Sequence, residues 1–350
     1  MKVFAHLGMP KTLTSALQEA FFSKNKDIHF LGVGVGSLID YVDDDINVLF
    51  ETLIPYASER FYGSNRVYYK KCFDAQIDNA IGAGAKWVGV SSEWLGFNFS
   101  PEMVDAELKI RRLSQMIGQD ARILFIIRDQ KALLKSLYAE LVKVGYSGSF
   151  QDYCAYLWNF RDRGLLDDYC YDVQFDRLSR YFDLNNLSFL PLEHHRKANG
   201  DLETIDGKLK IVEALCGLLG LEYPDSFSLP KVNPSLNQKE ILKKRHLNRG
   251  RRHDFGNFIF EPSNIHRGRM QLKKNDSVGI DDYFRDVKVK RMLIAEAKKG
   301  NDDVPMEEVF SLDPELSAKL DHYFAVSNRR FQELSGIQLP EIYPWMHSPT

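Results

Sequence analysis

The sequence predicts a three-layer α/β fold, in which helices cover both faces of a mostly parallel central β-sheet. Short apolar, β-rich runs alternate along the chain with stretches whose apolar residues recur at helical intervals. The run ARILFIIRD (121–129) is continuously apolar, as expected of a central parallel strand buried on both faces. The 350 residues suffice for one large domain or two ordinary ones, and we interpret 1–350 as a single domain.

The other elements follow from the same patterns. Short apolar or β-rich runs predict strands at 2–7, 28–35, 86–92 and 187–192. Helical spacing predicts helices from Thr14, at 102–117 behind Pro101, at 131–144, at 207–221 and at 313–335, with mixed helix and loop over 36–80. We treat 305–350 as a C-terminal helical segment.

Composition excludes several classes of function. The net charge of -2 lacks the overall basicity of a dedicated nucleic-acid binder. No run approaches the ~20 apolar residues of a membrane span, and the N-terminal VFAHLG is too short for a secretory signal. We therefore expect a cytoplasmic protein with no nucleic-acid partner and no transmembrane segment. Four separated cysteines without metal-ligand spacing predict reduced thiols and no metal site.

The stretch FAHLGMPKTLTSALQ (4–18) is the first candidate binding motif. A strand, a glycine and a lysine lead into a helix that begins near Thr14. The free N–H groups of a helix start, its dipole and the Lys11 ammonium converge there, so the motif predicts an anion site. It lacks the G-x-x-x-x-G-K-S/T spacing of nucleoside triphosphatases. Taken alone, the motif equally fits an ordinary helix cap beside a surface lysine.

A second candidate motif lies at the end of the strongest strand. Arg128 stands at its carboxyl end, where open α/β sheets bind ligands, and Ser136 follows eight residues later in the next helix. The two side chains could hold a phosphate through charge-assisted hydrogen bonds. Alternatively, Arg128 forms a structural ion pair with Asp129 or a helix end.

Together these motifs resemble the two donor-binding motifs of sulfotransferases that use 3′-phosphoadenosine-5′-phosphosulfate (PAPS). HLGMPKTLTSALQ resembles the 5′-phosphosulfate loop, G-x-P-K-S/T-G-T-S/T-x-L, and IIRDQKALLKSLY resembles the 3′-phosphate motif. WVGVSSEWL, LSFLPLE, VNPSL and SNRRF are weaker likenesses to bacterial members. The resemblance implies a P-loop-like sulfotransferase fold, PAPS as the donor, 3′-phosphoadenosine 5′-phosphate (PAP) as the product, and no metal.

The resemblance also implies roles for individual residues. Lys11 would stabilise the leaving oxygen, and Arg128 and Ser136 would hold the 3′-phosphate. The loop residues assigned to the 5′-phosphosulfate are Gly8, Pro10, Lys11, Thr12, Leu13, Thr14 and Ser15. Two positions depart from the family pattern: Leu13 replaces a glycine and Gln130 replaces the usual proline. A Cβ at position 13 would narrow the approach of phosphate if the backbone needs a positive φ there.

The general base is expected near the end of the 86–92 strand. Glu93 is the first candidate, with Ser92 beside it to orient the acceptor. Glu93 could instead cap a turn or pair with a lysine. His6 is a second candidate, although a histidine in a strand is more often a satisfied interior residue. The acidic residues of 40–51 are a third source.

Residues 230–285 form a basic segment that we expect to be a loop-rich lid. KKRHLNRGRRH (243–253) and HRGRMQLKK (266–274) contain no acidic residue, and Arg249, Arg251 and Arg252 are candidates for substrate binding. The segment could cover the 3′-phosphate, bind an acidic glycan or lipid headgroup, or remain a solvated loop. We favour a carbohydrate or glycolipid acceptor. The alternatives to a sulfotransferase are a P-loop small-molecule kinase and a noncatalytic PAPS- or PAP-binding protein.

Overall fold

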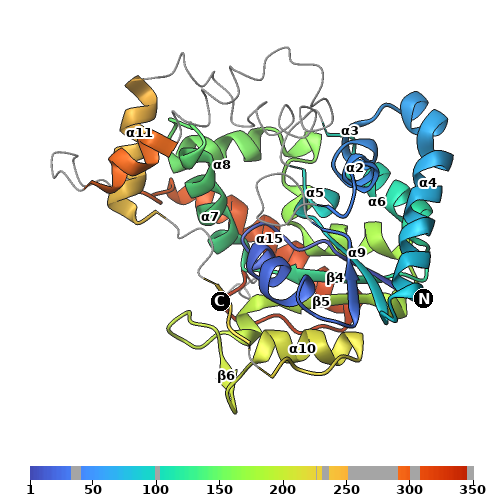
Figure 1. The fold of residues 1–350 in the computed structure, drawn as a ribbon. Helices are drawn as coiled ribbons and strands as arrows, with labels where there is room; N and C mark the ends of the chain where they lie inside the picture. Colours follow the sequence, from blue (N-terminus) through green and yellow to red (C-terminus); the bar gives the residue numbers. More distant parts are fainter. Residues whose placement is uncertain are drawn as a thin grey trace.

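A five-stranded parallel sheet forms the centre of the protein (Figure 1). The computed structural model describes residues 1–32, 41–98, 103–225, 227–230, 236–250, 291–299 and 308–344. The strands lie in the order β2-β3-β1-β4-β5. Their bounds are Lys2–His6 (β1), Ile28–Phe30 (β2), Trp87–Ser91 (β3), Arg122–Ile127 (β4) and Leu187–Pro191 (β5). The predicted mostly parallel α/β fold is confirmed.

The strand order places the carboxyl ends of β3, β1 and β4 next to one another at one edge of the sheet. β1 pairs with β3, with His6 beside Ser91, and on its other side with β4. The chain passes from β1 to β2 and β3 on one side, and only then to β4 and β5 on the other. The carboxyl end of β1 is therefore a topological switch point, where sheets of this kind bind ligands.

Helices cover both faces of the sheet, because successive strand residues point to opposite sides. Phe4, Leu124 and Ile126 pack on one face with the helix at 14–22 and with α10. Ala5, Ile123 and Phe125 pack on the other face, in the core that α4, α6, α7, α9 and α15 share. Figure 1 shows α10 below the sheet and α4 and α6 on the opposite side. The three-layer arrangement agrees with the prediction.

The helices have the following bounds. The first layer contains Thr14–Leu17 (α1), continued by the π-helical Gln18–Phe22 (η1), and Lys210–Leu219 (α10), which follows a short hairpin of Thr204–Ile205 (β6) and Lys208–Leu209 (β7). The others are Asp44–Val48 (α2), Leu49–Leu53 (η2), Ile54–Tyr56 (α3), Glu59–Gly82 (α4), Glu93–Gly96 (α5), Ala106–Ile117 (α6), Gln130–Lys143 (α7), Phe150–Asn159 (α8), Arg161–Arg163 (η3), Asp167–Tyr169 (η4), Tyr171–Ser179 (α9), Leu184–Asn186 (η5), Leu192–His195 (η6), Gln238–Gly250 (α11) and Pro314–Ser335 (α15).

Two boundaries differ clearly from those that the sequence predicts. The helix expected at 102–117 begins at Ala106, because the Asp105 side chain accepts the Glu107 N–H at 2.8 Å and caps the helix there. The strand expected at 28–35 ends at Phe30. Pro101 and residues 33–40 lie outside the described ranges. None of the described helices is long and apolar enough to cross a membrane.

The basic segment is not loop throughout. Residues 238–250 form helix α11, which packs on α7 (Figure 1). Ile241 and Leu242 are buried, and this burial explains why the segment is helical despite its charge. The sequence pattern predicted no helix at 238–250, and the loop-rich lid stays a prediction. VNPSL, apart from its last residue, and the stretch 266–274 fall outside the described residues.

Candidate active site

The loop after β1 has an unusual backbone conformation. Lys11 and Leu13 adopt positive φ angles of 66° and 69°. Side chains other than glycine, asparagine and aspartate rarely occupy this region, and strain of this kind is concentrated at functional sites. Position 13 is the one where the sulfotransferase loop has glycine. The structure therefore shows the positive φ that the glycine would accommodate without strain, while this chain carries leucine.

The helix that follows the loop begins without a side-chain cap. Leu13 occupies the N-cap position and its side chain makes no capping hydrogen bond. The starts of α2, α4, α6, α7, α8 and α15 are capped by an aspartate or serine, whereas α5, α9 and α10 also begin without a side-chain cap. The first backbone N–H groups of the 14–22 helix thus lack the side-chain partner that six other helices have. An anion can take that place.

The hydroxyl groups of the loop differ in what they contact. Thr12 donates to the Met9 carbonyl at 2.5 Å and closes the loop. The buried Thr14 hydroxyl lies close enough to the Glu93 carboxyl group to lower its pKa, and Ser15 is exposed. A Cβ on Gly8 would lie 2.8 Å from His6 Nε2 and 3.0 Å from Thr14 Oγ1. Gly8 therefore lets the loop pass between these two side chains.

Lys11 contacts the helix that carries the second motif. Its Nζ lies 2.8 Å from Glu140 Oε1 of α7, and Lys143 Nζ lies 2.7 Å from the same oxygen. Although burial opposes it, the charges of Lys11 and Lys143 hold the pKa of Glu140 below its usual value. Ser136 is half-buried one helical turn before Glu140 and shares its face of α7. Lys11 and Ser136 thus belong to one region of the structure.

Arg128 joins the two motifs directly. Its Nη1 donates to the Lys11 carbonyl at 3.2 Å, and its Nε is buried without a hydrogen-bond partner in the described part of the chain. Burial and the nearby Arg196 lower the pKa of Arg128. No ion pair forms between Arg128 and Asp129, whose carboxylate caps α7 by accepting the Ala132 N–H at 2.7 Å.

Glu93 lies beside the same loop, as the first residue of α5. Burial raises its pKa to about 7, while the Thr14 hydroxyl and the Lys11 charge oppose this rise and Glu140 adds to it. The side chain therefore lies in the electrostatic field of the first motif. A carboxyl group with a pKa near 7 can take up and release a proton at neutral pH.

A second carboxyl group of the same kind lies behind Ser92. Ser92 Oγ is 3.5 Å from Glu51 Oε1, which also accepts the Tyr41 hydroxyl at 2.8 Å. Glu51 is buried, and burial raises its pKa to about 7, against the opposing effect of these two hydroxyl groups. Glu51 is one of the acidic residues of 40–51 that were considered as a source of the base. It lies next to Ser92, the residue expected to orient the acceptor.

His6 is enclosed in the sheet. Its Nδ1 lies 2.8 Å from Ser91 Oγ, which also accepts Gln18 Nε2 at 2.9 Å. Complete burial lowers the pKa of His6 to about 3, so the ring is neutral. His6 adjoins Gly8 and Thr14, but Glu93 is the candidate base with access to solvent.

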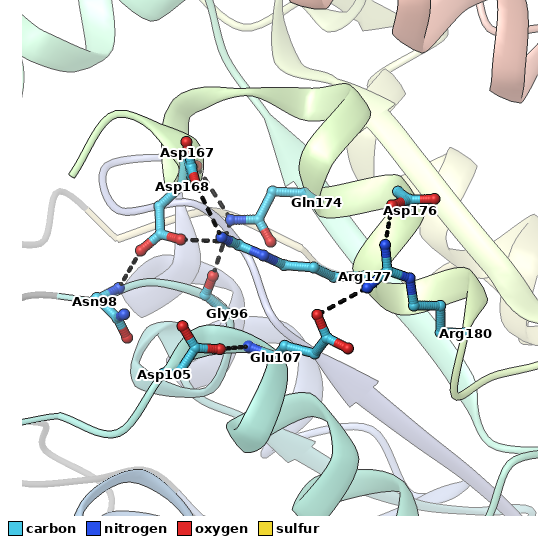
Figure 2. Close-up of polar contacts among 10 residues, drawn as sticks. All are labelled: Gly96, Asn98, Asp105, Glu107, Asp167, Asp168, Gln174, Asp176, Arg177 and Arg180. Carbon is cyan, nitrogen blue, oxygen red and sulfur yellow. Dashed lines mark hydrogen bonds and ion pairs between the residues drawn. The ribbon is translucent and has the colours of Figure 1, made fainter. Parts of the chain in front are cut away.

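The segment that carries Glu93 is held from behind by polar contacts that the sequence did not reveal. The buried Lys109 of α6 donates to the Trp94 and Phe97 carbonyls at 2.8 and 2.9 Å. Figure 2 shows Gln174 of α9 reaching the Gly96 carbonyl and Asp168 accepting the Asn98 N–H, with distances of 3.2 and 2.8 Å. These contacts connect residues that are far apart in sequence, so no local sequence pattern predicts them.

The other predicted residues lie elsewhere. Gln130 Nε2 donates to Asn328 Oδ1 at 2.6 Å and ties the start of α7 to α15. Arg249 Nε donates to the Ser147 carbonyl at 3.3 Å, beyond the carboxyl end of α7. Arg251 and Arg252 lie outside the described residues. The described residues contain no group of histidine, cysteine or carboxylate side chains that could hold a metal.

Comparisons with known proteins found similar chains among the solved structures. No family model matches the chain, and no curated protein matches it. The crystal structure of a sulfotransferase from Alicyclobacillus acidocaldarius matches over 97% of both chains, with 15% sequence identity and a TM-score of 0.48. A similarity of this degree carries no argument about function, which therefore depends on the residues of the site.

Proposed function

We propose that this protein is a sulfotransferase that moves the sulfuryl group of PAPS to a hydroxyl or amine of an acceptor. One observation carries the proposal. The hydrogen bond from Arg128 Nη1 to the Lys11 carbonyl brings together two anion-binding motifs that are 117 residues apart in sequence. This proximity is what a donor with phosphate groups at both ends of one nucleoside requires.

The two motifs supply different ligands. The uncapped helix start, Lys11 and the Thr14 hydroxyl would hold the 5′-phosphosulfate. Arg128 and Ser136 would hold the 3′-phosphate. The unpartnered Nε of Arg128 supports this assignment, because buried polar groups normally have partners and a bound anion would provide one.

The proposed reaction is an in-line displacement at sulfur. The acceptor oxygen forms a bond to sulfur while the bond from sulfur to the 5′-phosphate oxygen breaks, and the electron pair of that bond stays on the phosphate. The Lys11 ammonium would balance the charge on this oxygen, and the Glu93 carboxylate would take the acceptor proton. Positioning and electrostatics supply most of the acceleration in transfers of this type.

Glu140 would regulate the position of Lys11. Without a donor, the ammonium is paired with this carboxylate at 2.8 Å. A donor would replace one anionic partner with another, so the positive charge would never be left without a counter-ion. The exchange requires only a side-chain movement, since Lys143 keeps Glu140 paired at 2.7 Å.

The test is a measurement of PAP release from PAPS with a panel of hydroxyl acceptors. We expect Lys11→Ala to lower the rate by roughly 100-fold or more, as removal of a transition-state donor does. Lys143→Ala is the matched control, because it removes a cation from the same carboxylate but away from the loop, and it should retain most of the rate. Equal turnover by Lys11→Ala and the wild type would contradict the proposal.

A noncatalytic donor-binding protein is the second candidate, and Leu13 favours it. Leucine at φ 69° adds a Cβ where the sulfotransferase loop has none. On this alternative, PAP would stabilise the fold while no acceptor is sulfated. ATP with magnesium serves as a control donor, and turnover with it would favour a kinase. The carbohydrate or glycolipid acceptor stays a prediction.

A further inference from the structure

Buried polar atoms without partners gather at the carboxyl ends of β4 and β5. Protein interiors normally satisfy such atoms, so a cluster of exceptions calls for an explanation. Within the ranges that the structure describes, four of them come from two adjacent pairs of residues: Arg128 Nε, Asp129 Oδ2, His195 Nδ1 and Arg196 Nε. They follow neighbouring strands, since β4 pairs with β5 along its length.

Arg196 is the member of this cluster that the sequence analysis did not identify. It follows η6, which continues directly from the end of β5. Its positive charge is close enough to Arg128 to add to the effect of burial in lowering the pKa of Arg128. The two arginines thus follow neighbouring strands at this edge of the sheet, and the buried Nε of each has no hydrogen-bond partner among the described residues.

The nearby carboxylates do not pair with these arginines. Glu193 accepts the Asp129 N–H at 3.1 Å with one oxygen and the Tyr343 hydroxyl at 2.5 Å with the other. Asp129 caps α7. In the part of the chain that the structure covers, no ion pair joins Arg128 or Arg196 to a carboxylate. The acids reduce the net charge of the region but leave the guanidinium donors open.

We propose that Arg196 is a second phosphate-binding residue, which together with Arg128 binds the 3′-phosphate of the donor. Two guanidinium groups can surround a phosphate monoester with charge-assisted hydrogen bonds, and the dianion removes their mutual repulsion. The inference rests on the proposed use of a 3′-phosphorylated nucleotide. It adds a binding residue from the segment that follows β5 and η6, where the donor motifs place none.

The experiment compares two nucleotides that differ only in the 3′-phosphate. Isothermal calorimetry with the full chain measures the affinity for PAP and for adenosine 5′-monophosphate (AMP). We expect Arg196→Ala to weaken PAP binding by about 10- to 100-fold, as loss of a charged hydrogen-bond donor does, and to leave AMP binding unchanged. Lys197→Ala is the matched control, because it removes an exposed positive charge from the next position, and it should behave as the wild type.

Stability separates a binding role from a structural one. Without a ligand, Arg196→Ala removes a like-charge contact, so its melting temperature should equal or exceed that of the wild type, while the shift induced by PAP should shrink. Arg196→Lys keeps the charge but loses the planar donor fork, and should lose PAP affinity several-fold. This variant carries the test if Arg196→Ala does not fold.

The outcomes distinguish this inference from the proposed function. If the wild type prefers PAP to AMP and both variants keep that preference in full, Arg196 is not a phosphate ligand and only the inference is wrong. If the wild type binds PAP no better than AMP, or binds neither, the proposed function itself is contradicted and the inference is overturned with it.

Discussion

The two junctions where a central strand turns into a helix are built in opposite ways. After β1, two non-glycine residues have positive φ and the helix begins without a side-chain cap. After β4, Asp129 caps α7 and Gln130 is bonded to Asn328. The first junction thus leaves its backbone N–H groups open to an external anion. The second has already satisfied them, so an anion there must be bound by arginine side chains.

This difference implies that the two ends of the proposed donor are bound in different ways. At the first junction, backbone groups and a helix dipole act over short distances and fix the orientation of a phosphate. At the second, Arg128 and Arg196 provide charge on longer side chains. The geometry that transfer requires would therefore be set at the first junction, and affinity and selection of the 3′-phosphate at the second.

The largest expected effect concerns Glu93, which faces the first junction. Glu93→Gln should lower the rate of transfer by roughly 100- to 10,000-fold and abolish the rise of activity with pH around 7. Rate profiles against pH measure both effects. Glu51→Gln is the matched control, since the pKa of Glu51 is also raised to about 7. If Glu51→Gln loses the pH dependence and Glu93→Gln keeps it, the base lies behind Ser92.

The same substitution should have the opposite effect on stability. Burial raises the pKa of Glu93 from 4.5 to about 7, so the folded protein retains a proton that the unfolded chain releases between these values. The contribution of this group to stability is present below pH 4.5 and lost as pH rises through 7. At pH 8, Glu93→Gln should therefore raise the free energy of unfolding, by about 1–3 kcal/mol. Urea titrations at pH 5 and pH 8 measure it.

A smaller effect is expected from removing the cap of the second junction. Asp129→Ala should lower the free energy of unfolding by about 1 kcal/mol, the usual cost of losing an N-cap. PAP affinity should stay equal or rise, because a negative charge disappears beside Arg128. Asp105→Ala, which uncaps α6, should cost the same stability and leave PAP binding unchanged. A loss of PAP affinity in Asp129→Ala alone would mean that the capped junction itself binds the phosphate.

The smallest effect on stability should come from Leu13→Gly at the first junction. Relief of the positive φ contributes ~1–2 kcal/mol, while loss of the part-buried leucine costs about as much, so the net change should stay within about 1 kcal/mol. AMP and PAP should both bind a few-fold more tightly. Leu13→Ala keeps the Cβ and the strain but loses the packing, so it should be less stable than Leu13→Gly. The reverse order would show that the loop is not strained.

The five strands of the central sheet and the helices α1, α6, α7, α10 and α15 could be predicted from local pattern, whereas α8 and α9 were not predicted and α4 lies in a region expected to be mixed helix and loop. β4 and α7 were identified because a continuous apolar run and a leucine stripe are strong signals, and the second candidate motif lies at the junction between them. Boundaries were less certain where a side chain decided them, as at Asp105. The helix α11 was not predicted, because its many charged residues obscured the apolar pattern to which the buried Ile241 and Leu242 belong.

The contacts within the site were harder to predict, because the order of the strands creates them. Nothing local relates Lys11 to Glu140, or Ser92 to Glu51, until β1 lies between β3 and β4. The sequence around Arg196 does not distinguish it from any other residue after a strand. Only its position near Arg128, which follows the neighbouring strand, suggests a role in binding. Residue types at strand ends could therefore be named in advance, while their partners could not.

The bond between the Tyr343 hydroxyl and Glu193 connects residues 150 positions apart. Tyr343 is fully buried, so its ring has a fixed position near the end of β5. Both oxygens of Glu193 therefore have protein partners, because the other one accepts the Asp129 N–H. The segment after α15 thus holds this carboxylate in place, and loss of the Tyr343 hydroxyl would leave one of its oxygens without that partner.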